Sequence, residues 1–170
     1  MKNNLKKFEK IIGYNFRDKG ILKTALNHKS NEIKNITSVS NQRYEFLGDA
    51  VLELVITKYL FDNYPKMEEG DLTKIRSSAV NQNTLVEVAQ EISIGDYLSM
   101  SKSEESTGGR RKKSILEDSV EALIAAIYLD AGISESRNFI KKYFFPKIAN
   151  LSLSPGQKDY KTRLQEVYAK

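Results

Sequence analysis

The sequence contains no cysteine and only one histidine, His28. The absence of cysteine excludes disulfides, thiolate metal ligands and a cysteine nucleophile. A single histidine also leaves little for a Ser-His-Asp or Cys-His mechanism to use. We therefore expect His28 to be a capping or hydrogen-bonding residue rather than a catalyst.

Long apolar runs are missing as well. No stretch approaches the ~20 consecutive apolar residues that a membrane-spanning helix needs. The N-terminal segment MKNNLKKFEK is basic but lacks the apolar stretch of a signal peptide. We expect a cytoplasmic protein with no membrane segment. The 27 lysine and arginine residues outnumber the 22 acidic residues, and this net charge of +5 weakly favours a polyanionic partner.

The strict alternation of apolar and polar residues that is typical of β-strands is not found over any useful length, and neither is an internal repeat. Apolar residues instead recur with helical spacing along nearly the whole chain. The sequence therefore predicts an all-α fold.

Capping and breaking residues predict several helix ends. Gly13 should end the first helix, and Asp71 should begin another as its N-cap. Ser114 should cap the helix SILEDSVEALIAAIYLDAG, which Gly132 ends, and Pro146 should close the helix after it. The proline of DNYP should stop the helix before it, and the stretch IGDYLSMSKSEESTGGRRKK should be irregular.

The end of the chain differs from the rest. Residues 1–150 read as one helical domain, and residues 151–157 are rich in linker residues. Residues 158–170 then begin a new amphipathic helix, which would be marginally stable alone. We expect this segment to be the first helix of a second domain.

Two acidic residues interrupt the apolar helix predicted over the stretch YEFLGDAVLELVITKYLF. Glu45 and Asp49 lie one turn apart on one face, where like charges repel, and Gly48 costs roughly 1 kcal/mol relative to alanine. A cation between the carboxylates would offset the repulsion, and a close backbone neighbour would explain the glycine. The alternative is a pair of surface acids neutralised by lysines.

A second acidic group occurs in the stretch EDSVE. On a helix whose apolar face contains Leu116 and Val120, Asp118 and Glu121 share the polar side about 60° apart, with Glu117 nearer the apolar edge. Together with Glu45 and Asp49 they could form an oxygen-ligand site for Mg²⁺ or Mn²⁺. Acids at this spacing are also common on solvated helix faces, so the spacing alone leaves both interpretations open.

Four consecutive cations, Arg110, Arg111, Lys112 and Lys113, follow a Gly-Gly pair and precede the second acidic helix. A glycine turn, a basic run and a helix N-terminus together can bind phosphate. A flexible, solvated loop is the other interpretation, and the position beside a suspected metal site favours phosphate binding.

Several stretches resemble the motifs of the ribonuclease III family. NQRYEFLGDAVLEL is close to the family signature N-E-R-L-E-F-L-G-D-A-V-L, and GYNFRDKGILKTALNHKS resembles its N-terminal helices. EEGDLTKIRSSAVNQNTL and GGRRKKSILEDSVEALIAAIYLDAG resemble the blocks that follow, and KDYKTRLQE resembles the start of the double-stranded-RNA-binding domain of bacterial members. The motifs occur in the family's order and spacing over nearly the whole chain.

The resemblance implies a homodimeric, all-helical endonuclease that processes RNA precursors by hydrolysing double-stranded RNA. It implies Mg²⁺ as cofactor, which Mn²⁺ can replace, and products with 5′-phosphate and 3′-hydroxyl ends and two-nucleotide 3′ overhangs. Residue-by-residue matching puts the metal ligands at Glu45, Asp49, Asp118 and Glu121, with Asp49 and Glu121 also catalytic. Phe46 matches the aromatic ring that family members insert into the partner subunit.

Other matched positions have supporting roles. Glu69 matches an acidic position near the site, and Lys112 matches a basic position of the Gly-Gly loop, where we expect all four cations to face RNA. Gln42 stands where the family signature has its first glutamate, so this position keeps an oxygen donor but loses the charge.

Three other interpretations remain. The first is a non-catalytic RNA-binding relative of the nuclease domain, which Gln42 favours and the four retained acids oppose. The second is the miniature family form without the RNA-binding domain, which the final segment opposes. The third is a helical scaffold with surface acids, in which Glu45→Ala would be harmless or stabilising.

Overall fold

The computed structural model describes residues 2–31 and 39–152. Within these ranges the fold is all-α, as predicted, with no strand and one isolated bridge between Asn27 and Ser99. Its helices are α1 (Lys2–Ile12), α2 (Lys19–Ala25), α3 (Gln42–Asn63), α4 (Glu69–Ala79), α5 (Gln82–Glu91), α6 (Lys102–Ser106), α7 (Lys113–Ala131) and α8 (Ile133–Ser152). Short 3₁₀ turns are η1 (Lys29–Asn31), η2 (Ile94–Tyr97) and η3 (Gly109–Arg111).

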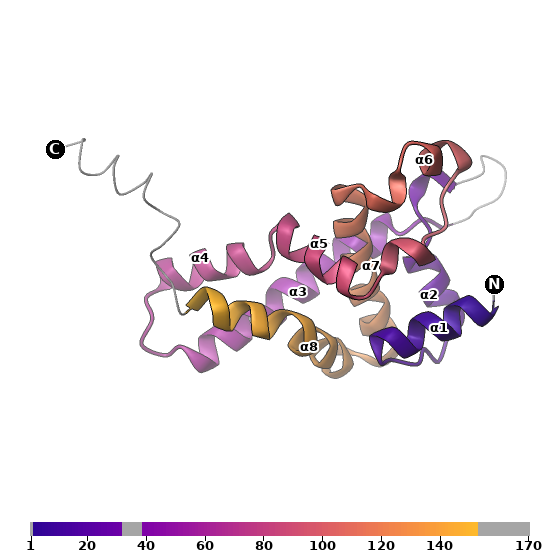
Figure 1. The fold of residues 1–170 in the computed structure, drawn as a ribbon. Coiled ribbons are helices and arrows are strands. Elements are labelled where there is room, and N and C mark those ends of the chain that lie inside the picture. The colour runs from indigo at the N-terminus through magenta and orange to yellow at the C-terminus, as the bar shows by residue number, and fades with distance from the viewer. Residues whose placement is uncertain (1, 32–38, 153–170) are drawn as a thin grey trace, which may run out of the picture.

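Helix α7 is the centre of the fold. It packs against α2, α3, α5 and α8, and Figure 1 shows α1 and α2 on one side of it and α3, α4 and α8 extending to the other. A helix enclosed by neighbours must be apolar nearly all round, and the buried run from Ala122 to Ile127 meets this requirement. The acidic residues of α7 therefore lie outside this run: Glu117, Asp118 and Glu121 precede it, and Asp130 follows it.

Several predicted boundaries are confirmed. Gly13 and Gly132 follow α1 and α7 with positive φ angles of 75° and 80°, which suit glycine. Helix α3 stops at Asn63, two residues before Pro65. None of the described helices is long and apolar enough to cross a lipid bilayer.

Three predicted boundaries are wrong. Helix α4 begins at Glu69 with Glu68 as N-cap, so Asp71 lies in its first turn. Helix α7 begins at Lys113, one residue before Ser114, and its N-cap makes no side-chain hydrogen bond.

The third error concerns Pro146, which lies inside α8 and does not end it. Phe144 and Ile148, on either side of the proline, are fully buried in the core, while Pro146 is exposed. Packing on both sides therefore outweighs the backbone hydrogen bond that proline loses. The stretch predicted to be irregular also contains η2, α6 and η3.

Helix α8 reaches Ser152, two residues past the expected domain boundary at 150. Most of the expected linker, and the whole expected helix over 158–170, lie outside the described residues. The second domain therefore stays a prediction.

Candidate active site

The first turns of α3 carry the first acidic pair. Asn41 precedes the helix, and its backbone N–H donates to the Asn27 carbonyl oxygen at 2.9 Å, which ties the start of α3 to the end of α2. Glu45 is half-buried and Asp49, one turn later, is exposed. Gln42 lies at the first position of the helix and is exposed, three residues before Glu45.

The second acidic pair lies on the side of α7 that faces α3. Asp118 and Glu121 are half-buried, while the intervening Ser119 and Val120 are fully buried against the rest of the core. The carboxylates therefore lie at the border between the core and solvent. The spacing of the apolar residues had predicted that this side of the helix is polar.

Gly48 brings the two helices together at this point. A Cβ atom built on Gly48 would lie 1.8 Å from the backbone oxygen of Glu121, closer than any real contact. The close approach predicted from the glycine is therefore a contact between the backbones of α3 and α7. It puts Glu45, one turn before the glycine, beside the acids of α7.

Three carboxylates meet in this crossing. One oxygen from each of Glu45, Asp118 and Glu121 lies within 4.8 Å of the others. Asp49 is not in this group of three, but its charge acts on Glu121 more strongly than that of any other residue. The structure thus brings together three of the four predicted ligands and puts the fourth at their edge.

The carboxylates raise one another's pKa values. Burial and then the charge of Asp49 raise the pKa of Glu121 from 4.5 to about 8. Burial is also the main cause that raises the pKa of Glu45, and the charge of Asp118 is the next. For Asp118, burial again raises the pKa most, followed by the charge of Glu117. The free protein therefore holds at least one proton in this cluster near neutral pH.

No ion pair neutralises the cluster within the described part of the chain. None of the four predicted ligands forms an ion pair with a lysine or arginine there. The donors are all carboxylate oxygens, with no sulfur and no imidazole among them. This set suits a hard divalent cation such as Mg²⁺ or Mn²⁺.

Glu117 has a different role from Asp118. Its carboxylate accepts a hydrogen bond of 2.6 Å from the Nε2 atom of Gln82, at the start of α5. It remains close enough to raise the pKa of its three acidic neighbours. Asp118, and not Glu117, lies with Glu45 and Glu121, and the contact between Glu117 and Gln82 could not be predicted from the sequence.

Lys29 is a neighbour of the cluster that the sequence did not single out. It is exposed on η1, and its charge opposes the raised pKa values of both Glu45 and Asp118. Lys29 follows α2 and lies far from both acids in the sequence, so no sequence pattern predicted that it would lie near the cluster.

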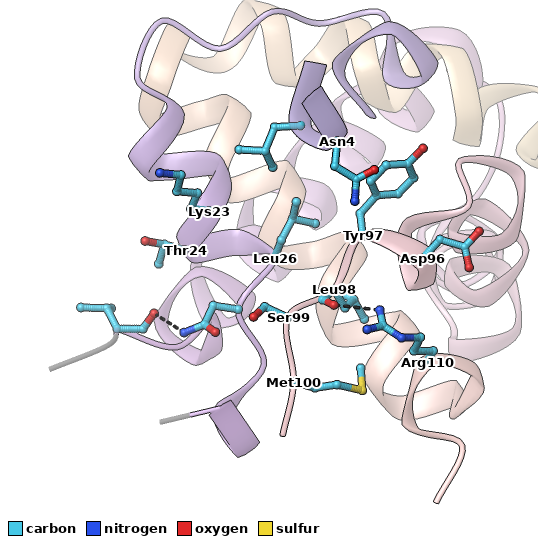
Figure 2. Close-up of a pocket in the computed structure, with 13 residues that line it drawn as sticks. Asn4, Lys23, Thr24, Leu26, Asp96, Tyr97, Leu98, Ser99, Met100 and Arg110 are labelled. Atoms are coloured by element: carbon cyan, nitrogen blue, oxygen red, sulfur yellow. Dashed lines mark hydrogen bonds between the residues drawn. The ribbon is translucent and has the colours of Figure 1, made fainter. Parts of the chain in front are cut away.

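The four predicted RNA-binding cations have unequal surroundings. The Arg110 guanidinium donates to the Gly95 and Leu98 carbonyl oxygens at 2.9 and 2.8 Å and pairs with Glu105, and Figure 2 shows its bond to Leu98. This arginine therefore holds the loop together. In contrast, Arg111 is exposed and forms no side-chain bond with any residue that the structure describes.

The two lysines after it are exposed but partnered. Lys112 donates to Glu104 at 2.6 Å and to the Thr107 hydroxyl at 3.1 Å, and Lys113 donates to Asn83 at 3.4 Å. A lysine ammonium has three N–H donors, so Lys112 retains one for another acceptor. Of the basic run, Arg111 through Lys113 remain open to an anionic ligand.

Two further predicted site residues lie away from the cluster: Phe46 on the exposed face of α3, and Glu69 at the start of α4. Phe46 is 83% exposed, an unusual state for an aromatic ring next to a core. Glu69 lies at the start of α4, in a pocket of about 190 Å³ that Thr57 and Phe61 from the far end of α3 also line. It is therefore not with the acidic cluster of its own chain, some 20 Å away along the helix.

A separate pocket of about 520 Å³ lies between α1, α2 and the segment Asp96–Met100 (Figure 2). None of the acidic residues of the cluster lines it. Its walls include Leu26, Leu98 and Arg110, so it borders the loop that Arg110 holds without being part of the acidic site.

Comparisons with known proteins agree with the motifs. The model of the family described as Ribonuclease-III-like matches residues 18–148. The chain is 49% identical over 169 residues to ribonuclease 3 of Clostridium perfringens, an alignment that covers 98% of this chain and 70% of that protein.

Solved structures show the same fold. The nuclease domain of ribonuclease III from Campylobacter jejuni matches with a TM-score of 0.79 and 42% identity, over 86% of this chain and 97% of that one. A second structure of that nuclease domain, described by flexibility in a region involved in dimer formation, matches with a TM-score of 0.75 and 44% identity, over 82% and 97%.

Proposed function

The chain belongs to the ribonuclease-III-like family as a ribonuclease III enzyme, and we propose that it hydrolyses double-stranded RNA with the help of Mg²⁺. The observation that carries this proposal is the acidic cluster. Three half-buried carboxylates from two helices converge within 4.8 Å, and none of them forms an ion pair with a lysine or arginine of the described residues. Such an arrangement costs free energy unless a cation binds there.

Glu45, Asp118 and Glu121 would hold the ion, with Asp49 at the edge of the site as the fourth ligand. When bound, Mg²⁺ supplies Lewis-acid activation of water and neutralises charge on a phosphodiester, and Mn²⁺ can replace it. Asp49 and Glu121 are the proposed catalytic carboxylates. Glu121, whose raised pKa reflects its burial, must lose its proton to become a ligand.

The exposed cations beside the cluster would bind the RNA backbone. Lys112 is the N-cap of α7 and lies about 9 Å along the helix from Asp118, and Arg111 precedes it. Lysine and arginine neutralise phosphates irrespective of base sequence, which fits recognition of duplex RNA by its shape. We assign RNA contact to Arg111, Lys112 and Lys113, and a structural role to Arg110.

The exposed apolar face of α3 supports a homodimer. Phe46, Leu54 and Phe61 are 83%, 61% and 71% exposed and, with Ala50, follow one face of the helix. The face is nearly symmetric about Leu54, so two copies of α3 can pair antiparallel around a twofold axis there. Each Phe46 would then lie against the pocket beside Phe61 of the partner subunit.

This pairing gives Glu69 a role consistent with its expected support of the site. Glu69 lines the pocket that would receive the partner's Phe46, next in sequence to the partner's Glu45. Its carboxylate would therefore act near the acidic cluster of the other subunit. Gln42, at the start of α3, would face the same region with an uncharged oxygen donor.

Two sites related by a twofold axis would cut opposite strands of one duplex. We propose that the products have 5′-phosphate and 3′-hydroxyl ends with two-nucleotide 3′ overhangs, and that the natural substrates are ribosomal and messenger RNA precursors in the cytoplasm. These statements follow from the family resemblance.

The test is incubation of the chain with a long RNA duplex at low salt, with Mg²⁺ or with Ca²⁺ or a chelator in its place. Mg²⁺-dependent short duplexes with the stated ends support the proposal. Binding without cleavage, unchanged by Gln42→Glu, would favour the non-catalytic RNA-binding relative. Cleavage restored by Gln42→Glu would keep the site and identify Gln42 as the cause of inactivity.

A further inference from the structure

The single histidine lies at a junction between two distant segments of the chain. The His28 backbone N–H donates to the Ser99 carbonyl oxygen at 2.9 Å, and the Ser99 N–H donates to the Leu26 carbonyl oxygen at 2.8 Å. Asn31 adds a side-chain bond of 2.9 Å to the Ser99 hydroxyl. Figure 2 shows Leu26 and Ser99 side by side in this junction.

The His28 ring is 95% buried and accepts hydrogen bonds through Nδ1. The backbone N–H of Ser30 donates to Nδ1 at 3.3 Å, and the Ser30 hydroxyl lies 2.8 Å from the same atom. The Ser101 backbone N–H donates to this hydroxyl oxygen at 3.1 Å, and with Nδ1 accepting from the Ser30 N–H, the hydroxyl can donate its proton to the same nitrogen. The imidazole is therefore neutral with its proton on Nε2, and burial lowers its pKa in agreement.

The next bonds lead from His28 to the basic loop. Ser101 is the N-cap of α6, and its hydroxyl accepts from the Glu104 N–H at 3.2 Å. One turn of α6 then presents Glu104, whose carboxylate holds the Lys112 ammonium at 2.6 Å. The pairing with Lys112 lowers the pKa of Glu104, so the carboxylate is ionised at neutral pH.

Close packing fixes the distance between α6 and the loop. A Cβ atom on Gly109 would lie 2.7 Å from the Glu104 carbonyl oxygen, so η3 lies directly on α6. A shift of the start of α6 would therefore move Lys112 relative to Asp118, which lies six residues, or about 1.7 turns, further along α7.

We propose that His28 is a positioning residue whose Nδ1 atom, acting through Ser30 and the start of α6, holds Lys112 beside the acidic cluster for contact with an RNA phosphate. This inference rests on the proposed function. It assigns the histidine to substrate binding and not to proton transfer, because the atom that bonds within the protein is Nδ1 and the bond leads to Lys112.

Two replacements separate the two ring nitrogens. In His28→Asn the side-chain oxygen can occupy the position of Nδ1 and accept from Ser30, whereas the longer side chain of His28→Gln reaches the position of Nε2 instead. We expect His28→Gln to raise KM for duplex RNA by about tenfold, the effect of one charge-assisted contact, with kcat nearly unchanged. We expect His28→Asn to retain the KM of the unaltered chain.

The link to Lys112 is tested by a double-mutant cycle. If His28 acts through Lys112, adding His28→Gln to Lys112→Ala raises KM no further, whereas independent effects would multiply. Hydrogen exchange gives a readout without RNA: the Ser101 amide should exchange about tenfold faster in His28→Gln and stay protected in His28→Asn. Ser30→Ala breaks the same link from the other side and carries the test if His28→Gln does not fold.

The proposal would be overturned if the effects of His28→Gln and Lys112→Ala on KM multiply. It would also be overturned if His28→Gln retains the KM of the unaltered chain and His28→Asn does not. A fall in kcat with KM unchanged would overturn it as well. If the unaltered chain cleaves duplex RNA and His28→Gln and Ser30→Ala match it, the inference fails and the proposed function stands. If the unaltered chain neither binds nor cleaves duplex RNA, the proposed function fails and takes the inference with it.

Discussion

Gly48 lies against the backbone of Glu121, with room for a hydrogen atom and not for a methyl group. The two residues are 73 positions apart, since 121 minus 48 is 73, and they belong to α3 and α7. Their contact explains why an apolar helix carries a glycine between two acids. The glycine lets the helices approach until the acids of each reach those of the other.

A methyl group at this contact should separate the helices. We expect Gly48→Ala to lower the free energy of unfolding by about 1–3 kcal/mol through overpacking and to weaken binding of Mn²⁺. The matched control is Gly70→Ala in the first turn of α4, where nothing lies within 4 Å of the added carbon. That change should be stabilising by up to about 1 kcal/mol. Urea denaturation measures the free energy of unfolding of both variants, and equal stability of the two would contradict the contact.

Loss of one ligand charge should stop the chemistry without preventing binding. We expect Glu121→Gln to abolish cleavage of duplex RNA while RNA affinity stays within a few fold, because the cations of the basic loop remain. Gel-based cleavage and fluorescence anisotropy measure the two properties. The same substitution at Glu135, in the first turn of α8, serves as control and should leave both unchanged. Full activity of Glu121→Gln would refute the assignment.

The stability of the metal-free protein should fall as pH rises. Glu121 has a pKa of about 8 in the folded chain against 4.5 as a model group, so the folded state binds more protons between these values. This contribution to stability is complete below about pH 4.5 and is lost as pH approaches 8. Thermal unfolding in a chelator should show the decline, and Glu121→Gln should flatten it. A Tm that rises between pH 5 and 8 in the unaltered chain but not in Glu121→Gln would contradict the raised pKa of Glu121.

The exposed ring on α3 should hold the dimer. We expect Phe46→Ala to shift the chain toward monomer in sedimentation velocity at micromolar concentration, because an apolar ring leaves the interface. Leu129, on α7, is 47% exposed and lies outside the proposed interface, so Leu129→Ala is the control. Unchanged sedimentation of Phe46→Ala would remove this residue from the dimer contact.

Two adjacent arginines should differ in what they support. Arg110→Ala removes a guanidinium that binds two backbone carbonyls, and we expect a loss of about 2 kcal/mol and a Tm lower by several degrees. Arg111→Ala should leave Tm unchanged and reduce the salt dependence of RNA binding by about one phosphate contact. Calorimetry and binding at a series of salt concentrations distinguish them. Equal effects on Tm would contradict the assignment.

The sequence predicted the helices and the acids better than their surroundings. The all-α fold, the ends at Gly13 and Gly132 and the close approach at Gly48 follow from local rules, because each depends on a residue's own backbone or periodicity. The partner of Gly48 could not be predicted, since it depends on how α3 crosses α7.

The errors concern helix ends and side-chain contacts. Helices α4 and α7 begin at exposed residues before the capping residues Asp71 and Ser114, and Pro146 is tolerated because Phe144 and Ile148 are buried around it. Charge alone could not separate Arg110 from Arg111, because only the fold brings the carbonyls of Gly95 and Leu98 to the first of them. The choice of Asp118 over Glu117 needed the family resemblance.

The near-symmetric face of α3 has a consequence for engineering. In the proposed dimer Leu54 of one subunit contacts Leu54 of the other, so a charge introduced at this position meets a like charge in the partner. Leu54→Lys and Leu54→Glu chains should therefore each resist self-pairing and should pair with one another. Mixing the two would give an obligate heterodimer. With Glu121→Gln in one of them, the assembly would have one working centre and would nick a duplex where the symmetric enzyme severs it.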